Sequence, residues 1–173
     1  DADRMDRLDD PSTFRYFSGE ELRAALDPDP GWTVADLGSG TGLFADEVAP
    51  TVERLYAVDR DPAMHRRYGE KGLPDNVAPL TADVADVPLP EDSLDAALSV
   101  RTFHHGVREA LPEIRRLLRP GGRFVVADWS ATATGEVGRD PKPDRFFEPG
   151  DAASALVDAG FRVRESRERW ETY

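Results

Sequence analysis

The sequence predicts an α/β fold, in which a doubly wound, mostly parallel sheet of six or seven strands carries helices on both faces. Three observations lead to this prediction. Short apolar runs alternate with segments of helical pattern, as in chains whose parallel strands are joined by right-handed crossovers. A glycine-rich turn follows the first apolar run. The length of 173 residues suits one domain with its own core.

Six strands are expected, each from an apolar run of strand length. In chain order they cover residues 32–37, 55–58, 77–80, 94–100 and 124–127, and a sixth begins at 161–164. Because helices separate these runs, the strands must lie mostly parallel, and both faces of the sheet are covered. Ligands bind such sheets beyond the carboxyl ends of the strands.

The expected helices follow local start and stop signals. Ser18 can open a helix within a helical N-terminal extension over residues 4–26. Asp61 can cap the helix after the second strand, with Pro62 at its first position. The remaining helices are expected at residues 41–49, at 107–118 with a stop at 120–122, and at 151–158.

The composition restricts the expected cellular environment and the expected classes of binding partner. The net charge is −12, from 34 acidic and 22 basic residues, so most of the surface repels phosphate backbones and nucleic acid is excluded as a default partner. There is no cysteine, which excludes disulfides and thiolate metal sites and suits the cytoplasm. No apolar run approaches the roughly 20 residues that cross a bilayer, so no membrane association is expected.

The basic residues are unevenly distributed between the two residue types. Only Lys71 and Lys142 are lysines, and every other basic residue is arginine. An acidic chain that is poor in lysine resembles halophilic proteins, whose surface repulsion is screened within a few ångströms in strong salt. The alternative is an ordinary acidic cytosolic protein from a GC-rich genome. We favour the halophile.

The most informative segment is the glycine loop, DLGSGTG at residues 36–42, which follows the first strand. Gly38 permits a tight turn, Gly40 allows a ligand to touch the backbone, and Gly42 is expected to let the following helix pack closely on the strand. The amino terminus of that helix would offer free N–H groups to a carboxylate or phosphate.

A second feature stands one strand away. Asp59 closes the second strand, where a carboxylate can accept hydrogen bonds from both hydroxyls of a ribose. The spacing of the loop is G-x-G-x-G, whereas dinucleotide-binding loops follow G-x-G-x-x-G. The simpler interpretation is a tight strand–helix turn beside an ordinary capping aspartate, but both features in register favour a nucleoside site.

These segments together resemble class I S-adenosylmethionine (SAM)-dependent methyltransferases, in the family's order, over about residues 32–128. The segments that carry the resemblance are DLGSGTG at 36–42, VD at 58–59, ADV at 82–84, PLPEDSLD at 88–95 and LRPGGRF at 118–124. The resemblance implies a Rossmann-like fold, SAM as cofactor with S-adenosylhomocysteine as product, and methyl transfer to an oxygen, nitrogen or carbon of a small molecule.

The resemblance also implies roles for particular residues. The methionine part of SAM would meet Asp36 and the backbone of the glycine loop. Ser99 or Val100 would offer a carbonyl to the methionine amino group. The cofactor-binding set is Asp36, Gly38, Ser39, Gly40, Gly42, Asp59 at the ribose, Arg60 beside the adenine, Asp83 at the adenine amino group, Val84 at the ring, Ser99, Val100, and Arg15 or Tyr16 closing over the cofactor.

The resemblance divides the single expected domain, residues 1–173, into three segments. They are an N-terminal helical lid segment at 1–30, a cofactor-binding core at 31–128, and a substrate loop with a C-terminal strand region at 129–173. Sheets of this family usually end in a two-strand hairpin, but only residues 170–173 remain for its last strand. Either the chain is clipped or that strand is missing.

Two histidines are the candidates for catalysis. His104 and His105 follow the fourth strand, at the active mouth of the sheet, and either could take a proton from the acceptor. A base is needed only if the acceptor must lose a proton, and the alternative is that one histidine caps or packs on the next helix. His65 is expected on the surface, and Arg115, Arg116 and Arg119 are expected on the solvated face of a helix.

Three other kinds of function have some support in the sequence: a metal site, an oxidoreductase and a SAM-binding protein without catalysis. The histidines lack metal-ligand spacing, so no metal site is predicted. An NAD(P)-dependent Rossmann oxidoreductase also has a glycine loop and an acidic strand end, but the loop spacing and Asp83 argue against it. A non-catalytic SAM-binding protein remains a third interpretation. The expected partner is a small-molecule methyl acceptor of unidentified structure, and the sequence leaves the oligomeric state open.

Overall fold

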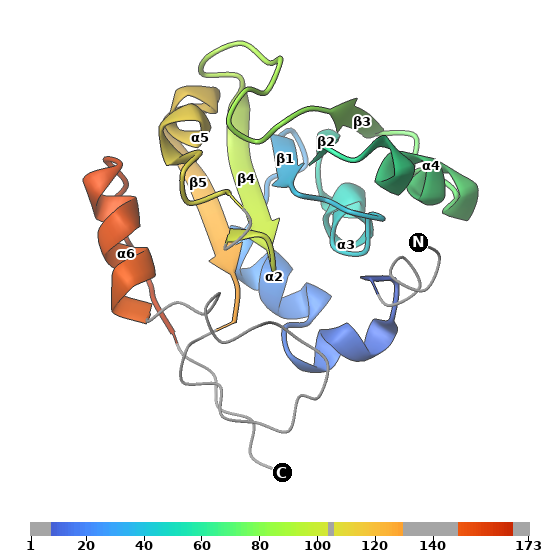
Figure 1. Ribbon diagram of the computed structural model, residues 1–173, viewed down its shortest axis with the longest axis horizontal. Coiled ribbons are helices and arrows are strands. Elements are labelled where there is room, and N and C mark those ends of the chain that lie inside the picture. Colours follow the sequence, from blue (N-terminus) through green and yellow to red (C-terminus); the bar gives the residue numbers. More distant parts are fainter. Residues whose placement is uncertain (1–7, 104–105, 130–148, 168–173) are drawn as a thin grey trace.

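The computed structural model of the protein describes residues 8–103, 106–129 and 149–167. Its centre is a sheet of five parallel strands in the order β3-β2-β1-β4-β5 (Figure 1). The strands are β1 (Thr33–Leu37), β2 (Arg54–Asp59), β3 (Val77–Thr81), β4 (Leu94–Val100) and β5 (Leu118–Ala127). The predicted doubly wound α/β architecture is confirmed.

Helices cover both faces of this sheet. They are η1 (Pro11–Arg15), α2 (Gly19–Leu26), α3 (Ala45–Val48), η2 (Ala49–Thr51), α4 (Pro62–Lys71), α5 (Leu111–Leu117) and α6 (Pro149–Asp158). In Figure 1, α5 and α6 lie on the β5 side of the molecule, and α4 lies beside β3.

Two hydrophobic clusters form the core, one on each face. The first joins α2, α3 and Tyr68 of α4 to the sheet, and the second joins α5 and α6 to it. Neighbouring residues of one strand enter opposite clusters, as Val34 and Ala35 do in β1. Since the central strands β1 and β4 are buried on both faces, their sequences are mostly apolar rather than apolar at alternate positions.

Two helix starts follow their predicted chemistry. Ser18 caps α2 in a reciprocal capping box with Glu21, in which the Glu21 N–H donates to Ser18 Oγ at 3.1 Å. The Asp61 carboxylate caps α4 by accepting from the Ala63 N–H at 2.9 Å, and Pro62 occupies the first turn. The N-terminal extension is, however, divided into η1 and α2 rather than continuous.

Several boundaries differ from the prediction. The helix expected at residues 41–49 is reduced to α3 and the short η2, because Gly40 and Gly42 have positive φ and hold residues 41–44 in turns. The helix expected at 107–118 begins only at Leu111, where Pro112 suits a first turn. It ends at Leu117, and β5 starts at once, six residues before its expected start.

The sixth strand is not present among the residues described. Residues 161–164 belong to no strand, although Phe161 packs against Phe124 of β5 with ring centroids 5.8 Å apart. A strand exists only where a neighbour supplies its ladder hydrogen bonds. The sheet of the described residues therefore has five strands, with β5 at its edge, instead of six or seven.

Candidate functional site

The glycine loop crosses from the end of β1 over the end of β2. The N–H groups of Gly38 and Ser39 both donate to the Val58 carbonyl oxygen, at 2.8 and 2.9 Å. Gly38, Gly40 and Gly42 have φ values of 81°, 54° and 88°, in the region that favours glycine. The loop is thus fixed by its own backbone conformation and by one carbonyl of the neighbouring strand.

The three glycines have different surroundings. A Cβ atom at Gly38 would lie 2.6 Å from Thr102 Cγ2, and one at Gly42 would lie 2.3 Å from Tyr68 Cζ. A Cβ at Gly40 would meet nothing nearer than Leu8 Cδ1, at 3.9 Å. The space beside Gly40 is therefore open, whereas the neighbour that excludes a side chain at Gly42 is the Tyr68 ring of α4 rather than β1.

Two carboxylates lie beside this loop. Asp36, at the end of β1, is 3% exposed, and burial together with the charge of Asp59 raises its pKa to about 7. Asp59 accepts from the Gly40 N–H through Oδ2 and from the Asp61 N–H through Oδ1, both at 2.9 Å. The predicted pairing of the glycine loop with a carboxylate one strand away is thus observed, but Asp59 is bonded to the loop itself.

One polar atom in the loop is left without a partner. Ser39 is 8% exposed, and its buried Oγ makes no hydrogen bond with any residue described. Buried hydroxyl groups in proteins are nearly always hydrogen-bonded. Together with the open backbone at Gly40, this hydroxyl fits a site that is completed by a polar ligand.

The end of β4 is fastened to β1 by hydroxyl groups. Thr102 donates through Oγ1 to the Leu37 carbonyl at 2.9 Å, and Ser99 Oγ lies 2.7 Å from Thr102 Oγ1. Ser99 is fully buried and Val100 is 8% exposed. The Ser99 hydroxyl therefore takes part in fastening β4 to β1.

The predicted adenine residues lie nearer the solvent. Arg60 and Asp83 are exposed, and Val84 is half-buried against the second core cluster. Asp83 stands at the start of the β3–β4 loop, residues 82–93, where its Oδ1 accepts from the Ala85 N–H at 2.9 Å. The structure therefore brings the glycine loop and Asp59 into direct contact, with Asp36 near enough to feel the charge of Asp59, and it places Asp83 and Val84 on the β3–β4 loop.

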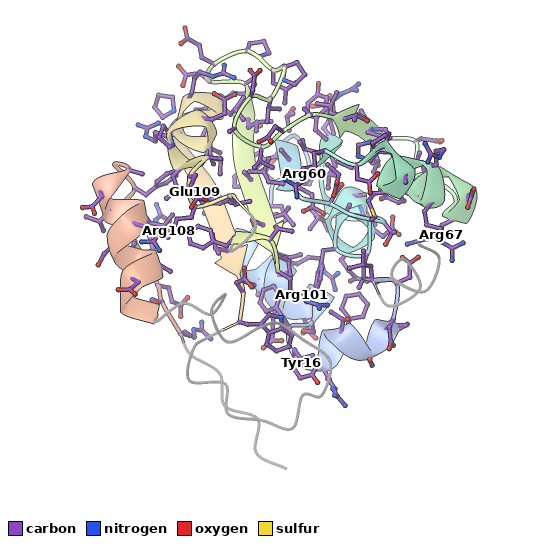
Figure 2. All side chains as sticks on the ribbon, viewed as in Figure 1. Tyr16, Arg60, Arg67, Arg101, Arg108 and Glu109 are labelled. Carbon is purple, nitrogen blue, oxygen red and sulfur yellow. The ribbon has the colours of Figure 1, made fainter. Side chains whose placement is uncertain are left out.

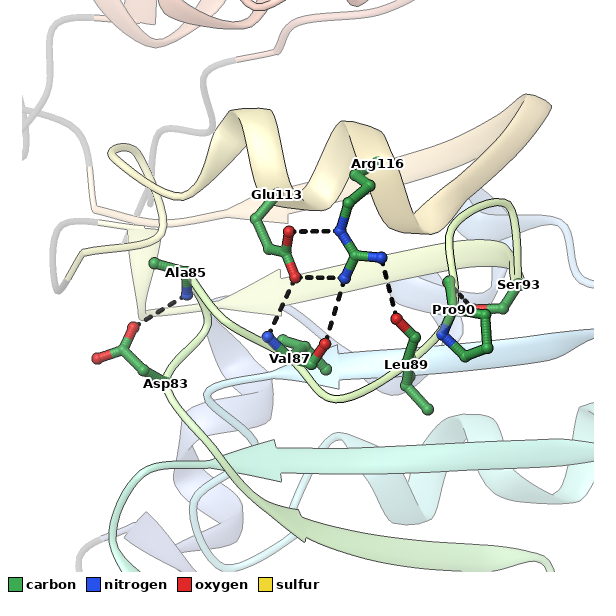
Figure 3. A network of polar contacts seen from close by, with 8 residues as sticks. All are labelled: Asp83, Ala85, Val87, Leu89, Pro90, Ser93, Glu113 and Arg116. Carbon is green, nitrogen blue, oxygen red and sulfur yellow. Dashed lines mark hydrogen bonds and ion pairs between the residues drawn. The ribbon is translucent and has the colours of Figure 1, made fainter.

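The β3–β4 loop is held by α5 in a way that the sequence did not indicate. Glu113 and Arg116 form an ion pair at 2.6 Å; Glu113 accepts from the Val87 N–H, and Arg116 donates to the Val87 and Leu89 carbonyls (Figure 3). The prediction of a solvated arginine face is wrong for Arg116. Arg119 is exposed, as predicted, but it lies in β5 rather than in the helix and bonds to Asp95 at 2.5 Å.

The N-terminal segment, residues 8–17, reaches two parts of the mouth of the sheet. The Tyr16 ring meets the Trp129 ring edge-on at 4.9 Å, and the Arg101 guanidinium lies 5.6 Å from the same ring. Arg101 also donates to Thr13 Oγ1 at 3.4 Å. Figure 2 shows Tyr16 and Arg101 on this side of the molecule. The side chain of Arg15 bonds to Tyr16.

Asp9 is the residue of this segment that touches the glycine loop, and sequence reasoning missed it. Its Oδ1 accepts from Thr41 Oγ1 at 2.7 Å and from Lys71 Nζ at 2.6 Å, and Lys71 also donates to the Thr41 carbonyl at 2.9 Å. Burial acts to raise the pKa of Asp9, but the hydrogen bonds from Lys71 and Thr41 outweigh it, and the pKa is lowered. Asp9 and Thr41 are 32 positions apart, so no local sequence signal marks this contact.

The histidines divide into two groups. His104 and His105 lie outside the described residues. His65 is half-buried rather than on the surface, because its Nδ1 lies 3.0 Å from Thr81 Oγ1 of β3, and burial lowers its pKa. Across residues 8–103, 106–129 and 149–167, no group of three or more potential ligands could hold a metal ion, and no helix there is long and apolar enough to span a membrane.

Comparisons with known proteins agree with this geometry. Residues 35–126 match the family described as a methyltransferase domain. The ubiquinone/menaquinone biosynthesis C-methyltransferase UbiE of Brucella canis is 34% identical over 111 residues, which cover 58% of this chain and 41% of that protein. The O-methyltransferase cnsE of Penicillium expansum is 29% identical over 163 residues, covering 83% of this chain and 56% of its own length.

A solved structure extends the likeness to nearly the whole chain. A SAM-dependent methyltransferase from Aquifex aeolicus superposes with a TM-score of 0.82 at 28% identity, over 95% of this chain and 90% of the other. The chain spans about half the length, or less, of the two curated relatives named above. Since the family match covers residues 35–126, which include the glycine loop, Asp59 and the β3–β4 loop, the chain belongs to the methyltransferase domain family.

Proposed function

We propose that the protein is a SAM-dependent methyltransferase that methylates an oxygen, nitrogen or carbon of a small molecule. The observation that carries this proposal is the contact between Gly40, whose backbone is open to a ligand, and Asp59 on the next strand. The contact lies at the carboxyl ends of β1 and β2, beside the reversal of strand order between β1 and β4, where sheets of this kind bind ligands.

The residues present fit an adenosyl ligand with an amino-acid tail. Gly38, Gly40 and the Ser39 hydroxyl would hold the tail, Asp36 would face its positive charge, and Asp59 would exchange its loop hydrogen bonds for those of the ribose hydroxyls. Val84 and Asp83 would meet the adenine. The remaining members of the proposed cofactor set are Gly42, Arg60, the Ser99 or Val100 carbonyl, and Arg15 or Tyr16.

SAM, when bound, supplies a methyl group on a sulfonium. The leaving group is a neutral thioether, so no acid is needed to assist its departure. The protein's task is then alignment of the acceptor in line with the methyl group. Where the acceptor must lose a proton, we propose His104 or His105 as the base, since both follow β4 at the mouth of the sheet. If the double change to alanine leaves turnover unaltered across pH, the base must be sought elsewhere.

A small-molecule acceptor has two supports. Relatives are named for C-methylation in quinone biosynthesis and for O-methylation. The net charge of −12 disfavours a polyanionic substrate. We further propose a single domain over residues 1–173 and a cytoplasmic, high-salt setting, the latter from the acidic composition with only two lysines.

The test is calorimetric titration of the protein with SAM, S-adenosylhomocysteine and NADH, at low and at molar salt. Binding of the first two without NADH supports the proposal, and binding of NADH alone would establish the oxidoreductase alternative. Transfer of a labelled methyl group to a panel of phenols, quinols, amines and acids then separates an enzyme from a SAM-binding protein without catalysis.

A further inference from the structure

Glu113 and Arg116 form a clip, here called the loop clip, between α5 and the β3–β4 loop (Figure 3). Arg116 donates twice to Glu113, from Nε at 2.7 Å and from Nη2 at 2.6 Å. Its Nη1 donates to the Leu89 carbonyl at 3.0 Å, and its Nη2 donates to the Val87 carbonyl at 3.2 Å. Glu113 Oε1 in turn accepts from the Val87 N–H at 3.1 Å.

The clip supplies the backbone partners that this loop lacks. Residues 82–93 contain no helix and no strand, so their N–H and C=O groups must be satisfied by other means. The two side chains take three of these groups, and the Asp92 N–H donates to the backbone carbonyl of Arg116 at 3.0 Å. Val87 is 2% exposed in the second core cluster, so the middle of the loop is fixed by packing as well.

A short rigid path connects the clip to the proposed adenine contacts. Between Val84 and Val87 lie only two residues, and both are held by Asp83: the Ala85 N–H donates to its Oδ1 at 2.9 Å, and the Asp86 N–H donates to its carbonyl at 3.0 Å. A displacement at Val87 therefore moves Asp83 and Val84 with it.

The ion pair alone would not explain this arrangement. The Arg116 side chain is 37% exposed, and exposed pairs typically contribute little to stability. What distinguishes the clip is geometry, because the planar guanidinium bonds a carboxylate on one edge and two carbonyl groups on the other. A lysine could not make these four bonds together.

We propose that Glu113 and Arg116 are positioning residues for the adenine, which hold the β3–β4 loop so that Asp83 and Val84 select this base over other purines. The inference rests on the proposed function, since it assigns the base of SAM to this loop. The clip acts from α5, through the loop backbone, and neither of its side chains touches the ligand.

The experiment compares two ligands that differ only in the base. S-adenosylhomocysteine carries an amino group where S-inosylhomocysteine carries an oxygen, so the amino donor proposed to meet Asp83 is present in the first alone. The variants are Arg116→Met, which removes all four bonds, and Glu113→Gln, which keeps an acceptor for Val87. Arg115→Met is the matched control, because Arg115 is exposed on the same helix and loses the same charge.

The wild-type protein should prefer the adenosyl ligand by about tenfold, roughly the worth of one hydrogen bond. Arg116→Met should lose most of this preference while its affinity for the inosyl ligand stays nearly unchanged, Glu113→Gln should lose part of it, and Arg115→Met should keep it. A merely structural role would weaken both ligands alike. If Arg116→Met does not fold, the partial loss in Glu113→Gln decides the question.

Three results would overturn the inference, and they differ from one another. If wild type binds neither ligand, the proposed function fails and the inference fails with it. If wild type binds both equally, the adenine does not meet Asp83. If wild type discriminates and folded Arg116→Met and Glu113→Gln discriminate as well, SAM binding stands and the positioning role alone is wrong.

Discussion

The glycine loop and the β3–β4 loop both bond to the end of β2, yet they obtain their shapes in different ways. The glycine loop owes its course to its own residues, since three of them have positive φ. The β3–β4 loop owes its course to Glu113 and Arg116, more than twenty positions further along the chain. A loop shaped by its own backbone can be recognised from local sequence, whereas one held by a distant helix cannot.

The largest expected effect is damage to the glycine loop from within. Gly42→Ala should destabilise the protein by roughly 5 kcal/mol, from left-handed strain and overpacking against Tyr68. Gly72→Ala is the control, because Gly72 also has positive φ but nothing within 4 Å of its Cβ position. Urea unfolding measures both, and equal losses would mean that the contact with Tyr68 contributes nothing.

The second prediction concerns the buried carboxyl group of Asp36, beside the glycine loop. The raised pKa of Asp36, about 7, means that between pH 3.8 and 7 the native state keeps a proton that the unfolded state has lost. Stability of the ligand-free protein should therefore fall as pH rises through this window, by up to about 4 kcal/mol. Asp36→Asn should lack this part of the slope in urea titrations at pH 5 and 8, and an unchanged slope would contradict the assignment.

The third prediction tests the contact that joins the glycine loop to β2. Asp59→Ala should weaken SAM binding by about 1.5–3 kcal/mol, the worth of charge-assisted hydrogen bonds. Asp61→Ala is the matched control, since Asp61 follows two positions later and caps α4. It should lower stability by about 1 kcal/mol while binding is nearly retained. Calorimetry of both variants decides, and equal binding losses would argue against the ribose role.

The smallest expected effect tests whether the conformation of the glycine loop depends only on its own residues. Lys71→Met removes the 2.6 Å pair with Asp9 and should cost about 1 kcal/mol or less at low salt, and less still at molar salt, where charges are screened. Arg66→Met, an exposed site on the same helix, should change nothing. Unfolding at two salt concentrations measures this, and a much larger loss would show that the N-terminal segment shapes the loop.

Sequence reasoning was most successful where a local signal decides the structure. The fourth strand was predicted with the bounds of β4, and Ser18 and Asp61 were recognised as helix caps. Asp59 was expected at the end of the second strand and lies there, in contact with Gly40. These features depend on a few neighbouring residues, whose preferences are the same in any fold.

The failures share the opposite cause. Arg116 looked like part of a solvated helix face, because its partners Val87 and Leu89 contribute backbone atoms that no pattern marks. Asp9 reaches Thr41 and Lys71 only after the N-terminal segment has packed on the sheet. The strand expected from residue 161 needs a neighbour to pair with, and apolar periodicity does not reveal whether one is present.

The rarity of lysine in this chain gives the contact between Asp9 and Lys71 a practical consequence. The Lys71 Nζ donates to Asp9 and to the Thr41 carbonyl, so an amine-selective reagent should reach it most readily when Asp9 has moved away. The whole sequence has only two side-chain amines, so the labelled peptides are simple to resolve. The rate of Lys71 acylation would then report how often the N-terminal segment, residues 8–17, leaves the glycine loop.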